Sequence, residues 1–272
     1  MLEISILKNT LELVEKGVKL ALVTITKSEG STPRVTGAQM SVLKDGSIIG
    51  TIGGGAIEKK AIELALEAIK DGESKSVYLH LADEGMVCGG EIEIFIQVYK
   101  PRPEILIVGG GHVSYALYKI ASLLNFDIVI FEDREEFVSH ERFPNAKKLI
   151  FGKIEEELKE YKIDENSYIV IVTRGHKYDG EALEAVIDSN ARYIGVIGSK
   201  KKVINMFSVI RDRGITEDKL SKVYAPIGLD IADNSPEEIA ISILAEILAV
   251  KNNKNAGHMK LTTLPPRLHG KE

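Results

Sequence analysis

The sequence predicts an α/β protein that combines a C-terminal Rossmann-type, doubly wound parallel sheet with a smaller N-terminal α+β domain. A strand, a glycine turn, a helix and a second strand follow one another from Glu104 to Arg134. Further strands and helices then alternate, as they do in parallel sheets. Before this region, the two prolines of Lys100-Pro101-Arg102-Pro103 stop either neighbouring element from running through. We therefore expect domains at residues 1–99 and 104–250, followed by a loose tail at 251–272.

The N-terminal domain shows helical and strand patterns in turn. Apolar residues at helical spacing predict a first helix that ends near Gly17, followed by a strand over 20–26. A hairpin over 39–52 turns at Asp45-Gly46, and a glycine triplet, Gly53-Gly54-Gly55, leads into a helix over 56–69. Strands over 77–81 and 92–99 complete the domain.

The unit from Glu104 to Arg134 has the form of a nucleotide-binding βαβ motif. Ile105 to Val108 is a buried strand, and Gly109-Gly110-Gly111 opens a helix. Glycines let a phosphate approach the amides at the helix start, where the helix dipole favours an anion. Asp133 lies 22 positions after Gly111 and is expected to accept a hydrogen bond from a ribose or a similar hydroxyl group. Ser114 replaces the third glycine of the motif, which weakens the prediction of a dinucleotide but leaves the predicted fold unchanged.

The later elements place polar loops after the strands. Strands are predicted over 148–151, 168–172 and 193–197, with helices over 154–161 and 180–189. Ser235-Pro236 with Glu238 provides an N-cap and a capping-box acid for a helix over 236–250. Ligands of open α/β sheets bind outside the carboxyl ends of the strands. The candidate ligand-binding residues at this edge are therefore His112, Arg174, His176, Asp179 and Ser199.

Composition excludes several classes of function. The net charge is -5, the sequence pI is about 5.8 and charges of both signs are interspersed, so nothing indicates nucleic-acid binding. Neither a signal peptide nor a membrane span is expected, and we expect a cytoplasmic protein. The single cysteine, Cys88, excludes an internal disulfide and a metal site built only of cysteines.

Three features of the first domain are candidate site residues. The triplet Gly53-Gly54-Gly55 precedes a helix, so its amides predict an anion nest, although a plain turn explains it equally well. Arg34 lies in a polar loop, and Cys88 lies in a glycine-flanked loop. A thiolate there can contact a soft metal such as molybdenum or carry sulfur, while a lone cysteine is more often an inert small apolar residue.

Several motifs, in order along the chain, resemble the XdhC/CoxI family, the accessory proteins of xanthine dehydrogenase and related molybdenum hydroxylases. They run from about residue 10 to residue 250. In the first domain the motifs are Gly30-Ser31-Thr32-Pro33-Arg34, the glycine triplet with Glu58, and Met86-x-Cys88-Gly89-Gly90. In the second they are Gly109-x-Gly111-His112, Asp133-Arg134, Thr173-Arg174-Gly175-His176 with Asp179, and Ala225-Pro226 to Asp230 before Pro236.

The resemblance implies a function and partners. Such proteins bind molybdenum cofactor (molybdopterin), protect it while a cysteine desulfurase adds its terminal sulfur, and insert it into the apo-hydroxylase. The resemblance therefore implies a non-catalytic chaperone, with Cys88 next to the molybdenum and the glycine turns on the phosphates.

Two other functions fit the same residues. One is an NAD(P)-dependent oxidoreductase that uses the Gly109 turn and Asp133, with His176 as the acid. The other is a regulatory Rossmann protein that senses nucleotide or redox state through Cys88. We also expect a homodimer, because the first helix and the alternating strand over 92–98 carry more apolar surface than one face of the domain needs.

Overall fold

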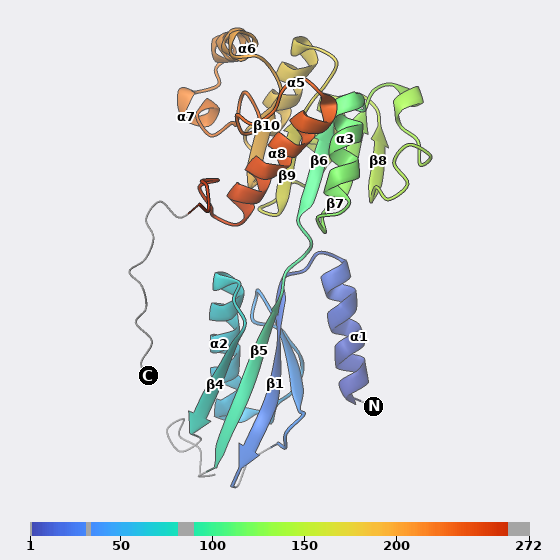
Figure 1. The fold of residues 1–272 in the computed structure, drawn as a ribbon. Helices are drawn as coiled ribbons and strands as arrows, with labels where there is room; N and C mark the ends of the chain where they lie inside the picture. Colours follow the sequence, from blue (N-terminus) through green and yellow to red (C-terminus); the bar gives the residue numbers. More distant parts are fainter. Residues whose placement is uncertain (1, 31–33, 81–89, 261–272) are drawn as a thin grey trace, which may run out of the picture. The chain divides into compact units, whose positions relative to one another are not determined.

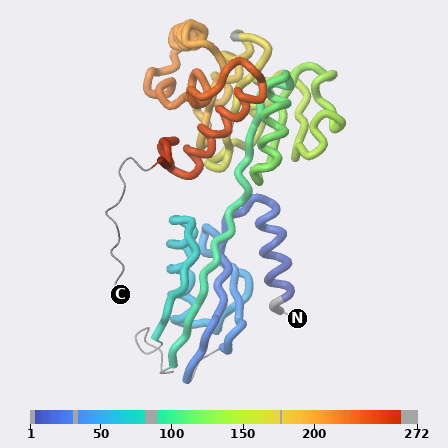
Figure 2. Tube along the Cα trace, in the orientation of Figure 1, coloured from blue at the N-terminus to red at the C-terminus, as the bar shows by residue number. Residues whose placement is uncertain are grey.

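The computed structural model describes residues 2–30, 34–80 and 90–260. The chain divides into two compact units, Met1–Arg102 and Pro103–Glu272. Each unit is a continuous stretch of sequence, and Figure 2 follows the chain through the first unit and then the second. None of the helices in these described ranges is both long and apolar enough to cross a membrane.

The first unit is an α+β domain built on an antiparallel five-stranded sheet in the order β3-β2-β1-β5-β4 (Figure 1). Its two long strands, β1 and β5, pair along most of their length. Its elements are α1 (Leu2–Glu15), β1 (Leu20–Glu29), β2 (Gln39–Leu43), β3 (Ile48–Gly50), α2 (Gly55–Asp71), β4 (Lys75–His80) and β5 (Glu91–Tyr99).

The two helices cover opposite faces of this sheet. Met40 and Val42 of β2 pack in the core beneath α2. Ser41, between them, points to the other face because side chains alternate along a strand. There its Oγ lies 2.6 Å from Oγ1 of Thr10 in α1. Helix α1 therefore packs on the face that α2 leaves open.

The structure corrects one argument for self-association. Ile92, Ile94 and Ile96 of β5 are buried in the core under α2, so these side chains offer no surface for self-association. Helix α1 does. Ile4, Leu7 and Leu11 are 60%, 47% and 58% exposed. Their spacing places them on one side of the helix.

The second unit confirms the prediction of a doubly wound parallel sheet. All neighbouring strands in the order β10-β9-β6-β7-β8 run parallel. Its elements are β6 (Glu104–Val108), α3 (His112–Ala121), β7 (Asp127–Glu132), the short 3-10 helix η1 (Glu135–Phe137), β8 (Lys148–Phe151), α4 (Ile154–Glu160), β9 (Ser167–Ile171), α5 (His176–Val186), β10 (Tyr193–Val196), α6 (Lys200–Asp212), α7 (Glu217–Leu220) and α8 (Pro236–Lys251).

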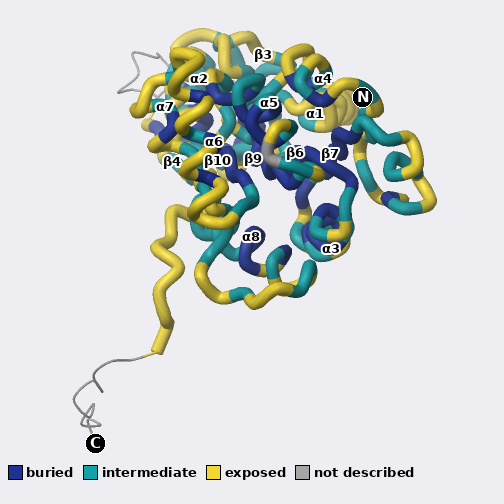
Figure 3. The backbone as a smooth tube through the Cα atoms, turned by 90° about the horizontal axis from the view of Figure 1, so that it is seen from above, coloured by how far each residue is buried: buried dark blue, intermediate teal, exposed yellow. Residues whose placement is uncertain are grey.

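Both faces of the parallel sheet are covered by helices. On one face, α3 and α8 pack on alternate strand residues such as Ile107 and Ile130. On the other, α4, α5 and α6 pack on the intervening residues, such as Val108 and Phe131. The strands β6, β7 and β9 therefore form the buried interior, drawn dark blue in Figure 3. A sheet buried on both faces explains why these strands are almost wholly apolar.

Three helices of this unit bear on the sequence predictions. The capped helix at Pro236 is confirmed, since the Ser235 hydroxyl accepts the amide of Glu238 at 3.2 Å. Helix α5 begins at His176, four residues earlier than expected, because Gly175 ends the preceding turn. The loop predicted at this edge is therefore largely the first turn of α5. Helix α6 was not predicted, and its first turn carries three consecutive lysines.

Candidate functional site

A crevice of about 230 Å³ lies at the carboxyl edge of the parallel sheet, where the strand order reverses around β6. The turn after β6, the end of β7 and the turn after β9 meet there. This is the position at which open α/β sheets bind their ligands. The lining residues are Gly111, His112, Arg134, Phe137, Val172, Thr173 and Arg174.

The first and third glycines of the turn after β6 differ in what the protein requires of them. Gly109 has φ 116°, and a Cβ there would lie 2.6 Å from the carbonyl oxygen of Val172. No other residue fits without strain. Gly111 has φ -70°, and a Cβ there would meet no atom within 4 Å. The fold itself therefore does not need glycine at 111, and the space beside it is open.

The start of α3 presents unused backbone donors to this space. Gly111 is the N-cap, and it makes no side-chain cap hydrogen bond. The first intrahelical bond of α3 is made by Tyr115, to the carbonyl of Gly111. Among the described residues, no acceptor meets the amides of Gly111, His112 and Val113. Such amides, at the positive end of a helix dipole, favour an anion.

The amide of Gly110 has a different partner, the carboxylate of Glu132. Glu132 ends β7 and is 2% exposed. Its Oε2 accepts the Gly110 amide at 2.5 Å and Nη2 of Arg134 at 2.7 Å. Its Oε1 accepts the Asp133 amide and Nε of Arg134. Burial would raise the pKa of Glu132, but hydrogen bonds with Arg134, Asp133 and Gly110 and the charge of Arg134 lower it to about 2.

Asp133 and Arg174, both predicted site residues, form an ion pair at this edge. Nη2 of Arg174 donates to Oδ2 of Asp133 at 2.8 Å. Arg174 also lies over the ring of Tyr178, 4.5 Å from its centroid. Burial and the neighbouring Glu132 carboxylate raise the pKa of Asp133, against the lowering effect of Arg174. Arg174 thereby takes Oδ2, one of the two oxygens that Asp133 could offer to a ribose.

Two further arginines stand beside the glycine turn. The guanidinium of Arg134 stacks on the ring of Phe137, 3.9 Å from its centroid. Nη2 of Arg142 donates to the carbonyls of Gly110 and Gly111, at 3.1 and 3.3 Å. Arg142 therefore adds a positive charge next to the turn and satisfies the carbonyls that face it. Sequence patterns did not identify Glu132, Phe137 or Arg142. Phe137 and Arg142 lie in a segment with no periodicity.

The other predicted residues of this unit lie around the crevice in different roles. Asp179 is buried, and its Oδ1 accepts the amide and the hydroxyl of Thr173, at 3.1 and 2.6 Å. It thereby fixes the turn that carries Arg174. Ser199 caps α6 by accepting the Lys202 amide at 3.4 Å, and does not line the crevice. His112 lines it. His176 begins α5.

The glycine triplet of the first unit is held from within. Gly53, Gly54 and Gly55 have φ 131°, 73° and 65°, a run that only glycine adopts without strain. Oε2 of Glu58 accepts the amides of Ile52 and Gly54, each at 3.3 Å, and the hydroxyl of Thr51 at 2.5 Å. The predicted nest is thus occupied by the protein's own carboxylate.

Arg34 and Cys88 are the last two predicted site residues. Arg34 is exposed, and Cys88 lies outside the described residues. Within the described ranges, no group of three or more His, Cys, Asp or Glu side chains is placed to hold a metal ion. The crevice therefore has the chemistry of an anion site lined by backbone amides and arginines.

Two family models match the chain. The model of the XdhC Rossmann domain matches residues 105–247. The model of the XdhC and CoxI family matches residues 13–81.

Three curated proteins are similar to the chain. YqeB of Escherichia coli strain K12, described as uncharacterized, is 37% identical over 93% of this chain and 48% of its own length. A protein of Bacillus subtilis strain 168, described as a probable subunit of xanthine dehydrogenase, is 28% identical over 58% of this chain and 46% of its own length. The chain thus spans about half the length of these two relatives. The molybdenum cofactor insertion chaperone PaoD of Escherichia coli strain K12 is 19% identical over 91% of this chain and 88% of its own length.

A solved structure shares the fold. The chain matches a crystal structure described as a xanthine dehydrogenase from Bacillus halodurans with a TM-score of 0.51 and 21% identity. The match covers 95% of this chain and 98% of that one.

Proposed function

Because the chain belongs to the XdhC and CoxI family, we propose that it is a molybdenum cofactor chaperone that serves a xanthine dehydrogenase-type hydroxylase. Two relatives support this proposal. One is described as a molybdenum cofactor insertion chaperone and the other as a probable subunit of xanthine dehydrogenase. In this proposal the chain acts in the cytoplasm, protects the cofactor during sulfuration by a cysteine desulfurase, and delivers it to the apo-hydroxylase.

The observation that carries the proposal is the set of unused donors at the start of α3. Molybdopterin carries a phosphate, and the amides of Gly111, His112 and Val113 face open space beside Gly111. Arg134 and Arg174 line the same crevice, and Arg142 adds a charge behind the turn. These residues fit the phosphate end of the cofactor. They would bind it, orient it and keep water from it. The bound cofactor supplies the molybdenum chemistry of the hydroxylase.

We assign the metal end of the cofactor to Cys88, the only thiol in the chain. A thiolate is the soft ligand that suits molybdenum and sulfur transfer. Arg34 and the glycine triplet of the first unit are also proposed as ligand-binding residues. The Glu58 carboxylate already accepts the amide of Gly54, and Thr51 accepts that of Gly53, so these two glycines shape the turn. Neither Glu58 nor Thr51 accepts the amide of Gly55 among the described residues.

Binding of an NAD(P) cofactor is the competing function, because the Rossmann fold and the position of the crevice are those of dinucleotide sites. Two contacts oppose it. Glu132, at the end of β7, is turned under the glycine loop, and Asp133 is paired with Arg174. Both oxygens of Glu132 are thereby engaged, and Asp133 has only Oδ1 left for a ribose hydroxyl.

Equilibrium binding distinguishes the two functions. The full chain is titrated with molybdenum cofactor released from a donor protein, and separately with NAD and NADP. We expect the cofactor to bind and the nicotinamide nucleotides to bind far more weakly. In a second assay, apo-hydroxylase mixed with the loaded chain should gain activity faster than with free cofactor. Tight nicotinamide binding with turnover, and no binding of the molybdenum cofactor, would refute the proposal.

A further inference from the structure

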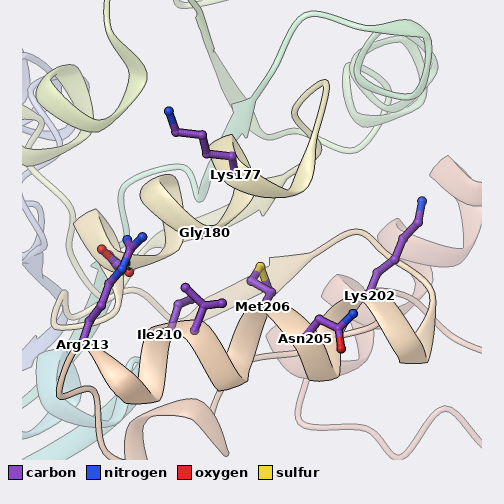
Figure 4. A pocket seen from close by; sticks show the side chains of 9 residues that line it. Lys177, Gly180, Lys202, Asn205, Met206, Ile210 and Arg213 are labelled. Atoms are coloured by element: carbon purple, nitrogen blue, oxygen red, sulfur yellow. Dashed lines mark hydrogen bonds and ion pairs between the residues drawn. The ribbon is translucent and has the colours of Figure 1, made fainter.

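A second hollow lies between α5 and α6, away from the glycine turn (Figure 4). It has a volume of about 320 Å³, within the range of small-molecule sites. Its floor is formed by Met206 and Ile210, which are 8% and 1% exposed. The full lining is Lys177, Gly180, Glu184, Lys202, Asn205, Met206, Val209, Ile210 and Arg213. We refer to it as the α5–α6 groove.

Residue 180 lines the groove from inside α5 and has no side chain. Glycine is among the least favourable residues in a helix interior. Here neither the backbone nor a neighbour demands it. A Cβ at 180 would lie 3.7 Å from Cγ of Met206 and 4.0 Å from Cδ1 of Ile210, which are ordinary contacts. A longer side chain at 180 would therefore occupy the space above Met206 and Ile210.

The two ends of the groove differ in charge. Helices α5 and α6 follow parallel strands on one face of the sheet, so both begin at the carboxyl edge. Lys177 and Lys202, in the first turns of these helices, line the groove, and Figure 4 shows their side chains extending away from its floor in different directions. Lys177 is 80% exposed and only loosely paired, 3.9 Å from Glu181, and Lys202 has no ion pair in the described part of the chain. At the other end, Arg213 and Glu184 pair at 2.8 Å and cancel.

We propose that the α5–α6 groove binds a small anionic aromatic molecule. Its ring lies over Met206 and Ile210 in the space left by Gly180, where a thioether makes a favourable contact with an aromatic ring. Its anionic group points to Lys177 and Lys202. This site is separate from the crevice beside Gly111, so its occupant is a second ligand and not the cofactor of the proposed function.

The test uses a pair of dyes that share the same rings, of which only one carries a sulfonate. The full chain is titrated with 1-anilinonaphthalene-8-sulfonate, and with N-phenyl-1-naphthylamine, which has the same rings without the sulfonate. Fluorescence should show one sulfonate dye bound per chain, and the neutral dye should bind at least about threefold more weakly. Equal affinity for the two dyes, or no binding of either, overturns the proposal.

Matched variants locate the dye. Gly180→Leu should fill the groove and weaken binding at least about tenfold, whereas Gly180→Ala should keep most of it. Lys202→Gln should weaken binding about threefold, and Lys201→Gln, which removes the same charge outside the groove, should not. Thermal unfolding checks that each variant is folded. Should Gly180→Leu not fold, the two lysine variants decide.

The crevice provides the remaining control, since aromatic sulfonates can also occupy nucleotide sites. Gly111→Val should leave dye binding unchanged, because it narrows only the crevice. If Gly111→Val loses dye binding while Gly180→Leu keeps it, the dye lies in the crevice and the proposal is overturned. Binding of molybdenum cofactor is measured on the same variants, so a failure of one site is not mistaken for a failure of the other.

Discussion

Oε2 of Glu132 accepts the amide of Gly110 at 2.5 Å, so a carboxylate lies directly beneath the glycine turn of the crevice. In a dinucleotide site of this fold, the acid at the end of the second strand faces the ribose. Here the carboxylate of Glu132, at this strand position, instead binds the glycine turn and Arg134. The crevice therefore keeps the amides of the helix start for an anion, and the Glu132 carboxylate is not available to the sugar.

Glu132 makes stability depend on pH in a defined window. Its pKa is about 2 in the folded chain against an ordinary 4.5, so its stabilising contribution is complete above pH 4.5 and is lost as the pH falls toward 2. Glu132→Gln should lower the free energy of unfolding by about 3 kcal/mol at neutral pH, because it leaves Arg134 without its partner. Urea unfolding from pH 7 downward measures both effects.

The control for this variant is Glu136→Gln, which removes an exposed carboxylate four residues away. It should change the free energy of unfolding by less than about 0.5 kcal/mol. The difference between parent and Glu132→Gln should shrink with acid below pH 4.5. A difference that stays constant over the whole range would show that the carboxylate is not responsible.

Gly109 and Gly111 should respond in opposite ways to substitution. Gly109→Ala forces a Cβ to within 2.6 Å of the Val172 carbonyl at φ 116°, and should cost about 3 kcal/mol of stability or more. Gly111→Val should cost about 1 kcal/mol or less, yet abolish binding of the molybdenum cofactor. Thermal unfolding and cofactor titration are run on both. A folded Gly111→Val variant with parental affinity would remove this turn from the site.

Asp133→Asn should change the affinity for molybdenum cofactor and the affinity for NAD in opposite directions. If Arg174 binds a phosphate, breaking its 2.8 Å pair with Asp133 frees the guanidinium and should tighten molybdenum cofactor binding about threefold. If Asp133 instead binds a ribose, the same change weakens binding of NAD. Arg174→Gln should weaken cofactor binding. Glu135→Gln removes an exposed charge nearby and serves as the control.

Cys88→Ala tests the proposed thiol contact. The variant should still bind molybdenum cofactor through the crevice, but the sulfurated form should decay faster when exposed to air. The half-life of the bound cofactor is followed by its capacity to activate apo-hydroxylase. Equal half-lives in variant and parent would mean that Cys88 does not contact the metal end.

The exposed face of α1 is the proposed dimer contact. Leu7 and Leu11 are 47% and 58% exposed, and a second copy of the same helix would bury them. Leu7→Glu should convert a dimer to a monomer in sedimentation at several protein concentrations. Lys8→Glu, which changes the neighbouring exposed residue, should not. A parent that sediments as a monomer would end the proposal.

The sequence predicts this molecule best where the pattern is periodic. The buried strands around Gly109 and the capped helix at Pro236 are confirmed, because a strand covered on both faces must be apolar and a capping box marks a helix start. Helix α6 was missed, since its polar first turn hides a stripe at Val203, Met206 and Ile210.

The contacts of the crevice depend on detail that no pattern carries. Glu132 and Asp133 are adjacent carboxylates, and only the parity of the strand decides which one turns inward to the glycine loop. Arg142 reaches the turn from an irregular segment, across 32 residues to Gly110. Contacts of this kind follow from tertiary packing, so the sequence predicts the edge of the sheet that carries the site but not the pairs within it.

The glycine turns of both units are closed by carboxylates of the chain itself, Glu58 in one and Glu132 in the other. Each carboxylate takes up amides that a bound anion would otherwise have to satisfy. Both turns can therefore form in a newly made chain before any ligand is encountered. With these bonds made inside the protein, neither turn depends on a bound ligand to keep its conformation.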